Sequence, residues 1–283
     1  MKNSFKILCL FISFSAFAQG PWTQEKGAFY AQLSYITIPN YTEFFGDPDY
    51  ETFGNISDNT VQLYTEYGLS QNTTLIASIP LKLISIKDYD NPALDCDNCS
   101  GDFSKNALGN IEIGLKHNFY KKDWLLSGQL SIEANTGTYE EISGLRTGYD
   151  AYTFTPLFLV GKGFEKSYLQ SFIGANIRTN NYSSNFRIGG EYGYKIFSKV
   201  WLVAFLDIVK SLENGSIELP IENTFTGFYV NDQDYGAYGL KVIGEITDKF
   251  GLNGGFGGAF FGNNVAKQAA FNFGVYYKFK KVK

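Results

Sequence analysis

The chain has 283 residues, with 24 Lys and Arg against 28 Asp and Glu and a formal net charge of −4 at pH 7. This mildly acidic balance excludes the basic surface of a nucleic-acid-binding protein, so we expect no nucleic-acid partner. Aromatic residues make up 17% of the chain and glycine contributes 30 residues, a composition that is unusual for a soluble domain.

The first 18 residues have the pattern of a secretory signal peptide. A short basic segment ends at Lys6, a mostly apolar run covers residues 7–14, and small residues precede Gln19. We therefore predict cleavage after Ala18 and export of residues 19–283. No later stretch approaches the roughly 20 continuous apolar residues that a membrane helix needs. A membrane role would therefore require a closed sheet.

From residue 28 onward, apolar and polar residues alternate in about a dozen stretches. In the last stretch, Phe271, Phe273 and Val275 share one face, whereas Asn272 and Gly274 share the other. This period of two predicts strands with one apolar and one polar face. The predicted strands cover residues 28–37, 60–69, 75–83, 110–116, 126–133, 152–160, 169–177, 187–195, 201–208, 238–245, 250–261 and 269–279.

The connections between these strands alternate between short and long. Turns such as 70–72 are tight, and long loops are predicted at about 38–58, 87–108, 136–150 and 212–234. This alternation is typical of bacterial outer-membrane barrels, with short periplasmic turns and long extracellular loops. We therefore predict an all-β fold, a transmembrane antiparallel β-barrel of about twelve strands in the outer membrane. The alternative is a secreted β-sandwich, which does not explain the alternation of loop lengths.

Three features concern the barrel wall and its mouth. Aromatic residues beside the short turns predict a girdle at the periplasmic interface, formed by Tyr67, Phe119, Trp124, Tyr168, Phe197, Phe250 and Tyr277. Pro80 and Pro156 fall inside predicted strands and each removes a ladder hydrogen bond, so we expect a bulge at one or both.

We expect the loops at 38–58, 87–108 and 212–234 to shape the outer mouth.

Two cysteines, Cys96 and Cys99, remain in the exported chain and lie in the predicted loop at 87–108. In an oxidising compartment this spacing predicts a small local disulfide. Free thiols and a metal site are the alternatives. Two thiols without nearby histidines make a poor zinc site, because tetrahedral zinc needs four ligands. We therefore predict no metal centre.

The polar face of the predicted strands carries charges of both signs. We expect the lumen to be lined by Glu66, Lys82, Glu112, Lys116, Gln129, Glu133, Arg178, Arg187, Glu191, Lys195, Asp207, Lys241 and Glu245. Two interpretations stay open. The acids and bases pair across a narrow lumen and only satisfy a polar interior, or they line a selective conduction path.

The sequence does not predict an enzyme. Lipase-type and protease-type barrels depend on a histidine paired with Ser or Asp for proton transfer. The single histidine, His117, falls on the apolar face beside a short turn, and we interpret it as a membrane-interface residue. No phosphate-binding loop or zinc-binding helix motif occurs, so we expect no cofactor.

Several short segments resemble one known family. They are residues 20–30 (GPWTQEKGAFY), 63–69 (LYTEYGL), 73–75 (TTL), 79–81 (IPL) and 134–137 (ANTG). In these segments the chain is similar to the outer-membrane proteins grouped under the meta-pathway of phenol degradation, and the likeness covers most of the mature chain. The resemblance implies a barrel that imports aromatic or other hydrophobic compounds and carries no catalytic residues.

We therefore expect an outer-membrane barrel that passes or binds small molecules, hydrophobic or aromatic compounds included. The alternative is a non-conducting structural or surface-interaction barrel whose lumen is closed by ion pairs. The expected partners are outer-membrane lipid, the barrel-assembly machinery and a small-molecule solute of unknown identity. The chain departs from the commonest barrel ending, because Phe279 is followed by residues 280–283 (KKVK).

Overall fold

The computed structural model describes residues 20–90, 100–220, 223 and 226–279. The predicted signal peptide and the pair Cys96 and Cys99 lie outside these residues, so their cleavage and pairing stay predictions. Within the described ranges, no helix is long and apolar enough to cross a membrane.

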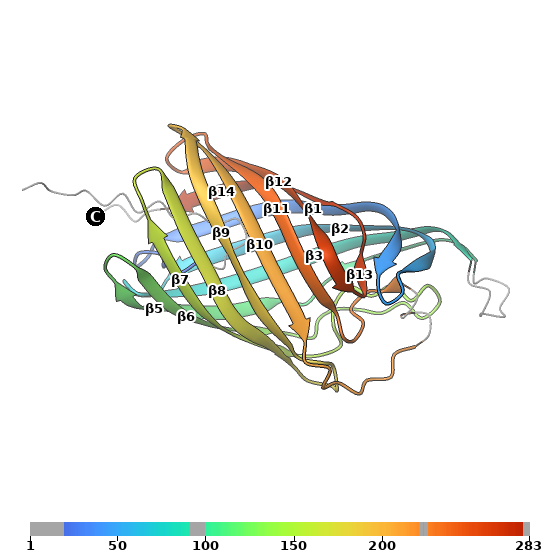
Figure 1. Ribbon diagram of the computed structural model, residues 1–283. Helices are drawn as coiled ribbons and strands as arrows, with labels where there is room; N and C mark the ends of the chain where they lie inside the picture. Colours follow the sequence, from blue (N-terminus) through green and yellow to red (C-terminus); the bar gives the residue numbers. More distant parts are fainter. Residues whose placement is uncertain (1–19, 91–99, 221–222, 224–225, 280–283) are drawn as a thin grey trace, which may run out of the picture.

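The described chain forms one strongly curved sheet (Figure 1). Its strands are β1 (Phe29–Phe45), β2 (Tyr50–Gly68), β3 (Thr73–Asp90), β4 (Ser100–Leu108), β5 (Glu112–Lys121), β6 (Leu125–Glu133), β7 (Thr153–Gly163), β8 (Ser167–Arg178), β9 (Asn185–Phe197), β10 (Val200–Ser211), β11 (Asp234–Glu245), β12 (Phe250–Asn263), β13 (Val265–Ala266) and β14 (Ala270–Phe279).

The sheet closes on itself as an antiparallel barrel. β1 pairs with β14 on one side and with β2 on the other, which completes the ring. β4 and β5 follow one another along β3 and occupy a single place in the wall, and the short β13 extends the pairing of β1. The 14 strands, less these two additions, therefore leave twelve around the barrel. The predicted fold class and strand number are confirmed.

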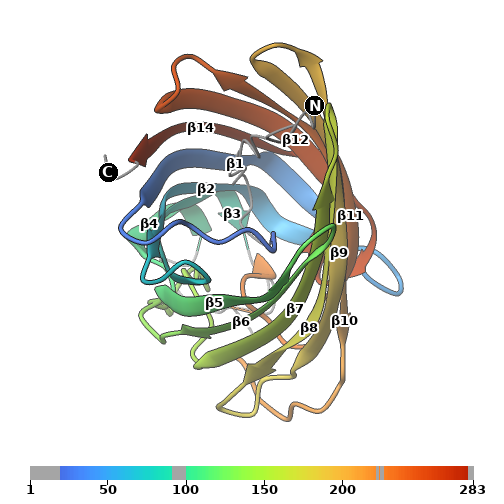
Figure 2. The ribbon, with the colours of Figure 1, turned by 90° about the vertical axis from the view of Figure 1, so that its left-hand side faces the viewer.

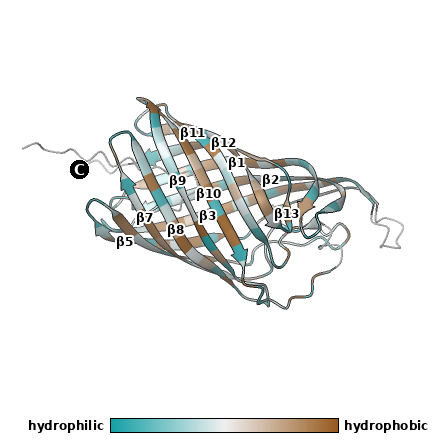
Figure 3. Ribbon diagram, in the orientation of Figure 1, coloured by the Kyte–Doolittle hydropathy of each residue, from teal (hydrophilic) through white to brown (hydrophobic). Residues whose placement is uncertain are grey.

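The strands alternate between an exposed apolar face and a buried face. In β14, Phe273 is 60% exposed, whereas the adjacent Asn272 is 8% exposed. Leu115 and Leu130, which face each other on β5 and β6, are likewise exposed. Figure 3 shows hydrophobic and hydrophilic residues alternating along the strands. So many large apolar side chains on an outer surface are suited to lipid and not to water.

The two ends of the barrel differ in their connections. The turns that join β2 to β3, β5 to β6, β7 to β8, β9 to β10 and β11 to β12 are short, and we call this the short-turn end. At the opposite, long-loop end, 134–152 is the third connection in chain order and 212–233 is the fifth, and we call them the third and the fifth long loop. Outer-membrane barrels place their short turns in the periplasm and their long loops outside.

The strands near the N-terminus extend further toward the long-loop end than the sequence predicts. The predicted loop at 38–58 is mostly a β1–β2 hairpin, and β4 lies inside the predicted loop at 87–108. Register shifts between Ile38 and Tyr41 and between Tyr41 and Glu43 exchange the two faces of β1. Such shifts interrupt the alternation of apolar and polar residues. The sequence pattern therefore ends at the first shift although the strand continues beyond it.

The expected bulge is confirmed at Pro80. β3 pairs Ser78 with Glu112 and Leu81 with Leu108, so two residues of β3 lie opposite the three residues 109–111 between β4 and β5. Pro156 behaves differently. The β7–β8 pairing is interrupted opposite Pro156 but resumes with no change of register.

Candidate functional site

The lumen is the candidate site, because the strand register directs all the predicted polar residues to the face opposite the exposed apolar side chains. Eight of the barrel's strands contribute these residues, namely β2, β3, β5, β6, β8, β9, β10 and β11. The residues on this inner face include Glu66, Lys82, Glu112, Lys116, Gln129, Glu133, Arg178, Arg187, Glu191, Lys195, Asp207, Lys241 and Glu245.

Two ion pairs lie deep in the lumen. Lys116 Nζ lies 3.0 Å from Glu66 Oε1, and the two side chains are 3% and 2% exposed. Lys241 Nζ contacts Glu191 Oε1, with the lysine side chain 1% exposed. Each pair joins residues on two strands that are separated by one strand, β3 or β10, so the side chains meet over that strand on the inner wall. Charges buried to this extent are stable only when they are paired.

Two further ion pairs lie closer to the long-loop end. Arg187 Nη2 donates to Asp207 Oδ2 over 3.2 Å, and Lys82 Nζ lies 2.5 Å from Asp58 Oδ1. Asp58 is not among the predicted lumen residues, because it falls at the end of a predicted loop that the structure shows to be part of β2. These pairs do not include Glu112 and Glu133, which face each other directly on β5 and β6.

Residues 20–27, which we call the inner segment, lie inside the barrel at the short-turn end. Figure 2 looks into this end and shows the segment crossing the opening from the start of β1. Gln24 is 8% exposed. Its Nε2 donates to Glu66 Oε2 over 2.7 Å, and its backbone N–H donates to Thr74 Oγ1 over 2.8 Å. The inner segment is therefore tied to one of the buried ion pairs.

The first half of the inner segment contacts the opposite side of the wall. The carbonyl of Pro21 accepts a hydrogen bond from Ser127 Oγ over 2.6 Å. The Trp22 ring lies edge-on to Tyr168, with ring centroids 5.7 Å apart, and Tyr168 in turn contacts Trp201. Tyr168 is 3% exposed and points into the lumen, so its predicted place in the lipid-facing girdle is wrong. Closeness to a short turn does not determine which face a ring occupies.

The third long loop folds over the lumen at the long-loop end. Its base is held by Asn110, a residue of the bulge opposite Pro80. Asn110 Nδ2 donates to the carbonyl of Tyr149 and its Oδ1 accepts from the N–H of Gly137, both over 2.9 Å. The bulge opposite Pro80 thus places Asn110 where it can hold both ends of the third long loop.

The third and fifth long loops contact each other in the mouth. Arg146 Nε donates to Asn223 Oδ1 over 2.8 Å, and Thr226 Oγ1 donates to the carbonyl of Gly144 over 2.9 Å. Leu145 is fully buried in an apolar cluster with Tyr41, Phe44, Ile56, Ile84, Ile86, Tyr89 and Phe228. The extended strands β1, β2 and β3 supply most of this cluster. The described part of the mouth is therefore formed by the third and fifth loops over the extended hairpins, to which residues of the predicted loop at 38–58 contribute. Residues 91–99 of the predicted loop at 87–108 lie outside the described residues.

Buried tyrosines of these loops keep their hydroxyl protons at neutral pH. Burial raises the pKa of Tyr229 to about 12 and raises the pKa of Tyr149 above its ordinary value. Tyr149 stacks under the Arg178 guanidinium, 4.0 Å from the ring centroid to Cζ. The loops therefore contribute neutral aromatic rings, and Arg178 supplies the positive charge.

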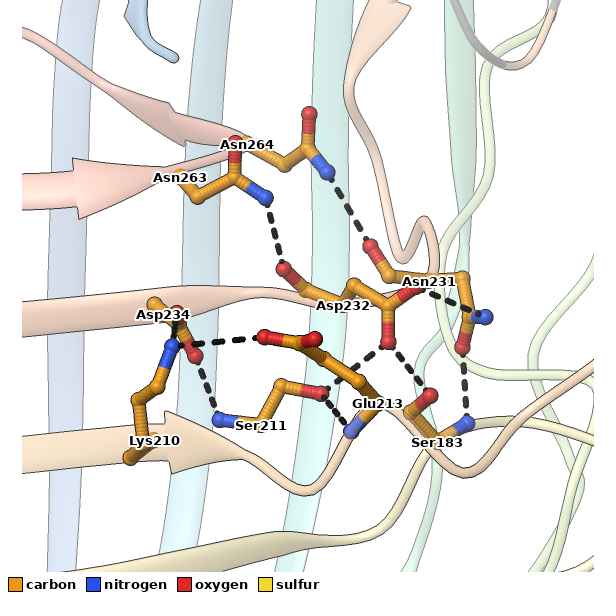
Figure 4. A network of polar contacts seen from close by, with 9 residues as sticks. All are labelled: Ser183, Lys210, Ser211, Glu213, Asn231, Asp232, Asp234, Asn263 and Asn264. Carbon is orange, nitrogen blue, oxygen red and sulfur yellow. Dashed lines mark hydrogen bonds and ion pairs between the residues drawn. The ribbon is translucent and has the colours of Figure 1, made fainter. Parts of the chain in front are cut away.

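Asp232 anchors the end of the fifth long loop (Figure 4). Its Oδ1 accepts hydrogen bonds from Ser183 Oγ over 2.5 Å and from Ser211 Oγ over 3.0 Å. Its Oδ2 accepts from Asn231 Nδ2 over 3.2 Å. Because hydrogen bonds to a charged acceptor contribute about 1.5–3 kcal/mol each, this carboxylate holds the loop to the strand ends.

We expect Asp232→Ala to release the fifth long loop. The variant loses three hydrogen bonds to one carboxylate, so native-state cleavage by chymotrypsin in residues 212–233 should accelerate at least tenfold. Glu218→Ala, at an exposed position in the same loop, is the matched control and should be cut at the wild-type rate. Equal rates for both variants would show that the carboxylate does not hold the loop.

His117 lies outside the lumen. Its side chain is on the exposed face of β5, where Nδ1 and Thr73 Oγ1 are 2.9 Å apart. This position agrees with a membrane-interface role and places the histidine on the face of the wall opposite the charged residues of the lumen.

Comparisons with known proteins give a fold likeness. No family model and no curated relative match the chain. The COG4313 outer membrane channel from Pseudomonas putida F1 has a TM-score of 0.67 at 14% identity, covering 94% of this chain and 100% of that one. The translocator domain of the autotransporter NalP from Neisseria meningitidis has a TM-score of 0.54 at 12% identity, covering 90% of each chain. The chain has the fold of outer-membrane β-barrels, and its closed wall and apolar exterior locate it in the outer membrane.

Proposed function

We propose that the protein passes small molecules, hydrophobic or aromatic compounds included, through a lumen that the inner segment closes and opens. The observation that carries this proposal is the nature of the obstruction at the short-turn end. A chain segment attached to β1 crosses the opening (Figure 2), and its contacts reach both sides of the inner wall. Such a segment can leave the lumen without breaking the barrel's strand pairing.

The junction between the inner segment and β1 is suited to act as a hinge about which the segment moves. Gly27 joins it to β1 with a φ of 78°, a conformation that glycine adopts readily. The remainder is held by two hydrogen bonds that the backbone and side chain of Gln24 donate, by two that the Pro21 carbonyl accepts, and by the Trp22 contact. These are few interactions compared with the twelve-stranded ladder, so the segment is the less stable element.

The proposed solute class is supported by a sequence resemblance, and the proposed channel role by a fold likeness. The inner segment contains residues that resemble the family grouped under the meta-pathway of phenol degradation, which stays a prediction because no family model matches. The COG4313 protein of similar fold is named an outer membrane channel. We also propose a non-enzymatic role, export through the signal peptide and insertion by the barrel-assembly machinery.

The second candidate is a non-conducting barrel with a structural or surface-interaction role. The observation that favours it is the pairing of Lys116 with Glu66 and of Lys241 with Glu191, which neutralises four charges of the inner face. In this case the ion pairs and loops form a permanent core, and the inner segment is part of it.

Two assays on refolded protein distinguish the channel from the non-conducting barrel. They are conductance in planar bilayers and solute uptake measured by liposome swelling. We expect low conductance from the wild-type protein and a several-fold increase when residues 20–26 are deleted, because the deletion removes the obstruction at the short-turn end. Lys26→Ala, at an exposed position, is the control and should conduct as the wild type does. If neither the wild type nor the deletion passes ions or solutes, the barrel is non-conducting.

A further inference from the structure

We propose that the inner wall of β8 to β11 holds a binding site for a neutral, flat molecule of one or two rings that carries an N–H or O–H donor. The inference rests on the proposed function, since it gives the passage a solute site, and it adds the location and the polarity of that site.

The site is a cavity of about 230 Å³, and this volume limits the size of the molecule that it can hold. It is lined by Gln170, Phe172, Arg187, Phe205, Asp207 and Tyr235, among others. An apolar cavity of about 150 Å³ is known to hold benzene, so this volume fits one or two fused rings. The three aromatic side chains provide flat apolar walls against which such a guest can stack.

The charges around the cavity exclude a strongly charged guest. Asp207 Oδ2 accepts a hydrogen bond from Arg187 Nη2 over 3.2 Å. Both oxygens of Glu191 are also used, because Oε1 contacts Lys241 and Oε2 accepts from Gln170 Nε2 over 3.0 Å. A cationic or anionic guest would therefore compete with an ion pair that already exists, at a cost in desolvation.

Two acceptors of the lining side chains remain available. Asp207 Oδ1 and Gln170 Oε1 are buried and have no hydrogen-bond partner among the described residues. A buried polar atom left unsatisfied is costly, and a guest that donates a hydrogen bond removes this cost. A flat molecule with an N–H or O–H edge therefore fits the site better than a hydrocarbon of the same shape.

The inner segment bounds the same cavity. The Gln170 side chain lines it and also lies against Gly20, so closely that a Cβ atom at Gly20 would collide with Oε1. The site thus lies directly beside the obstruction at the short-turn end. A bound guest would leave toward that end only after the inner segment moves.

Equilibrium dialysis tests the site with two probes, indole and 1-methylindole. The folded protein is held in lipid nanodiscs, and empty nanodiscs correct for partition into lipid. The probes share a ring system but only indole donates a hydrogen bond, so we expect indole to bind about tenfold more tightly. Equal affinities, or no binding above the empty-disc blank, would overturn the proposal.

A matched pair of variants locates the binding. Ala237 lines the cavity on β11, and Ala237→Phe should fill it and abolish indole binding. Ala204, on the exposed face of the neighbouring β10, is the control, and Ala204→Phe should bind indole as the wild type does. Indole binding that persists in folded Ala237→Phe would also overturn the proposal.

The outcomes separate this inference from the proposed function. A protein that conducts after deletion of residues 20–26 but binds no indole remains a channel without this site. A protein that binds indole selectively but never conducts keeps the site and loses the proposed transport role.

Discussion

Glu66→Gln is expected to lower the stability of the folded barrel by about 3–5 kcal/mol, the cost of leaving a buried charge without its partner. Lys116 Nζ lies 3.0 Å from Glu66 Oε1, and neither side chain is more than 3% exposed. The same carboxylate accepts hydrogen bonds from Tyr64 and Gln24 over 2.7 Å each. The loss would be measured as a lower urea midpoint for the heat-modifiable folded band on gels.

The double variant Glu66→Gln with Lys116→Gln separates the charge from the packing. Two facing amides leave no buried charge, so most of the lost stability should return. A double variant as unstable as the single one would show that the ion pair contributes little and that Glu66 acts through its other contacts. The exposed pair of Lys267 with Asp49 offers a control, since Asp49→Asn should leave the midpoint almost unchanged.

Arginine on the outer face is expected to prevent insertion. Leu115, Ile132 and Leu206 are 49%, 44% and 45% exposed and belong to the apolar exterior. Arg at the bilayer midplane costs about 2–4 kcal/mol, so Leu115→Arg, Ile132→Arg and Leu206→Arg should each lose most of the heat-modifiable folded band in refolding with lipid.

A charge on the inner face is the matched control. Gln129 lies directly opposite Lys116 on the lumen side of β6, so Gln129→Glu places an acid beside an existing base. This variant should fold, because the new acid faces the polar lumen and not lipid, beside Lys116, a base that it would share with Glu66. If Gln129→Glu failed to fold while the three arginine variants folded, the assignment of inner and outer faces would be reversed.

The inner segment explains why the sequence pattern alone does not describe the candidate site. Trp22 and Gln24 lie outside any strand, so no period marks them, and only the resemblance of residues 20–30 to a known family draws attention to them. Their contacts are with Tyr168 and with Glu66 and Thr74, residues that are distant along the chain. Such contacts exist only after the barrel has closed.

The sequence by itself determined the barrel. The period of two is a local property of each strand, because successive side chains point to opposite faces. It therefore predicted the strand number and the face on which residues such as Lys116, Arg187 and Lys241 lie. The bulge at Pro80 was also predictable, since proline lacks the N–H that a ladder requires.

Only the tertiary structure decided which residues meet inside. Lys116 with Glu66 and Lys241 with Glu191 are each separated by 50 residues, and their pairing depends on the register and tilt of the closed sheet. The same holds for the extension of β1 and β2 beyond the predicted strands and for Asp58, which the hairpin carries into the lumen. Register shifts and loop contacts are cooperative properties of the whole barrel, so no local pattern in the chain records them.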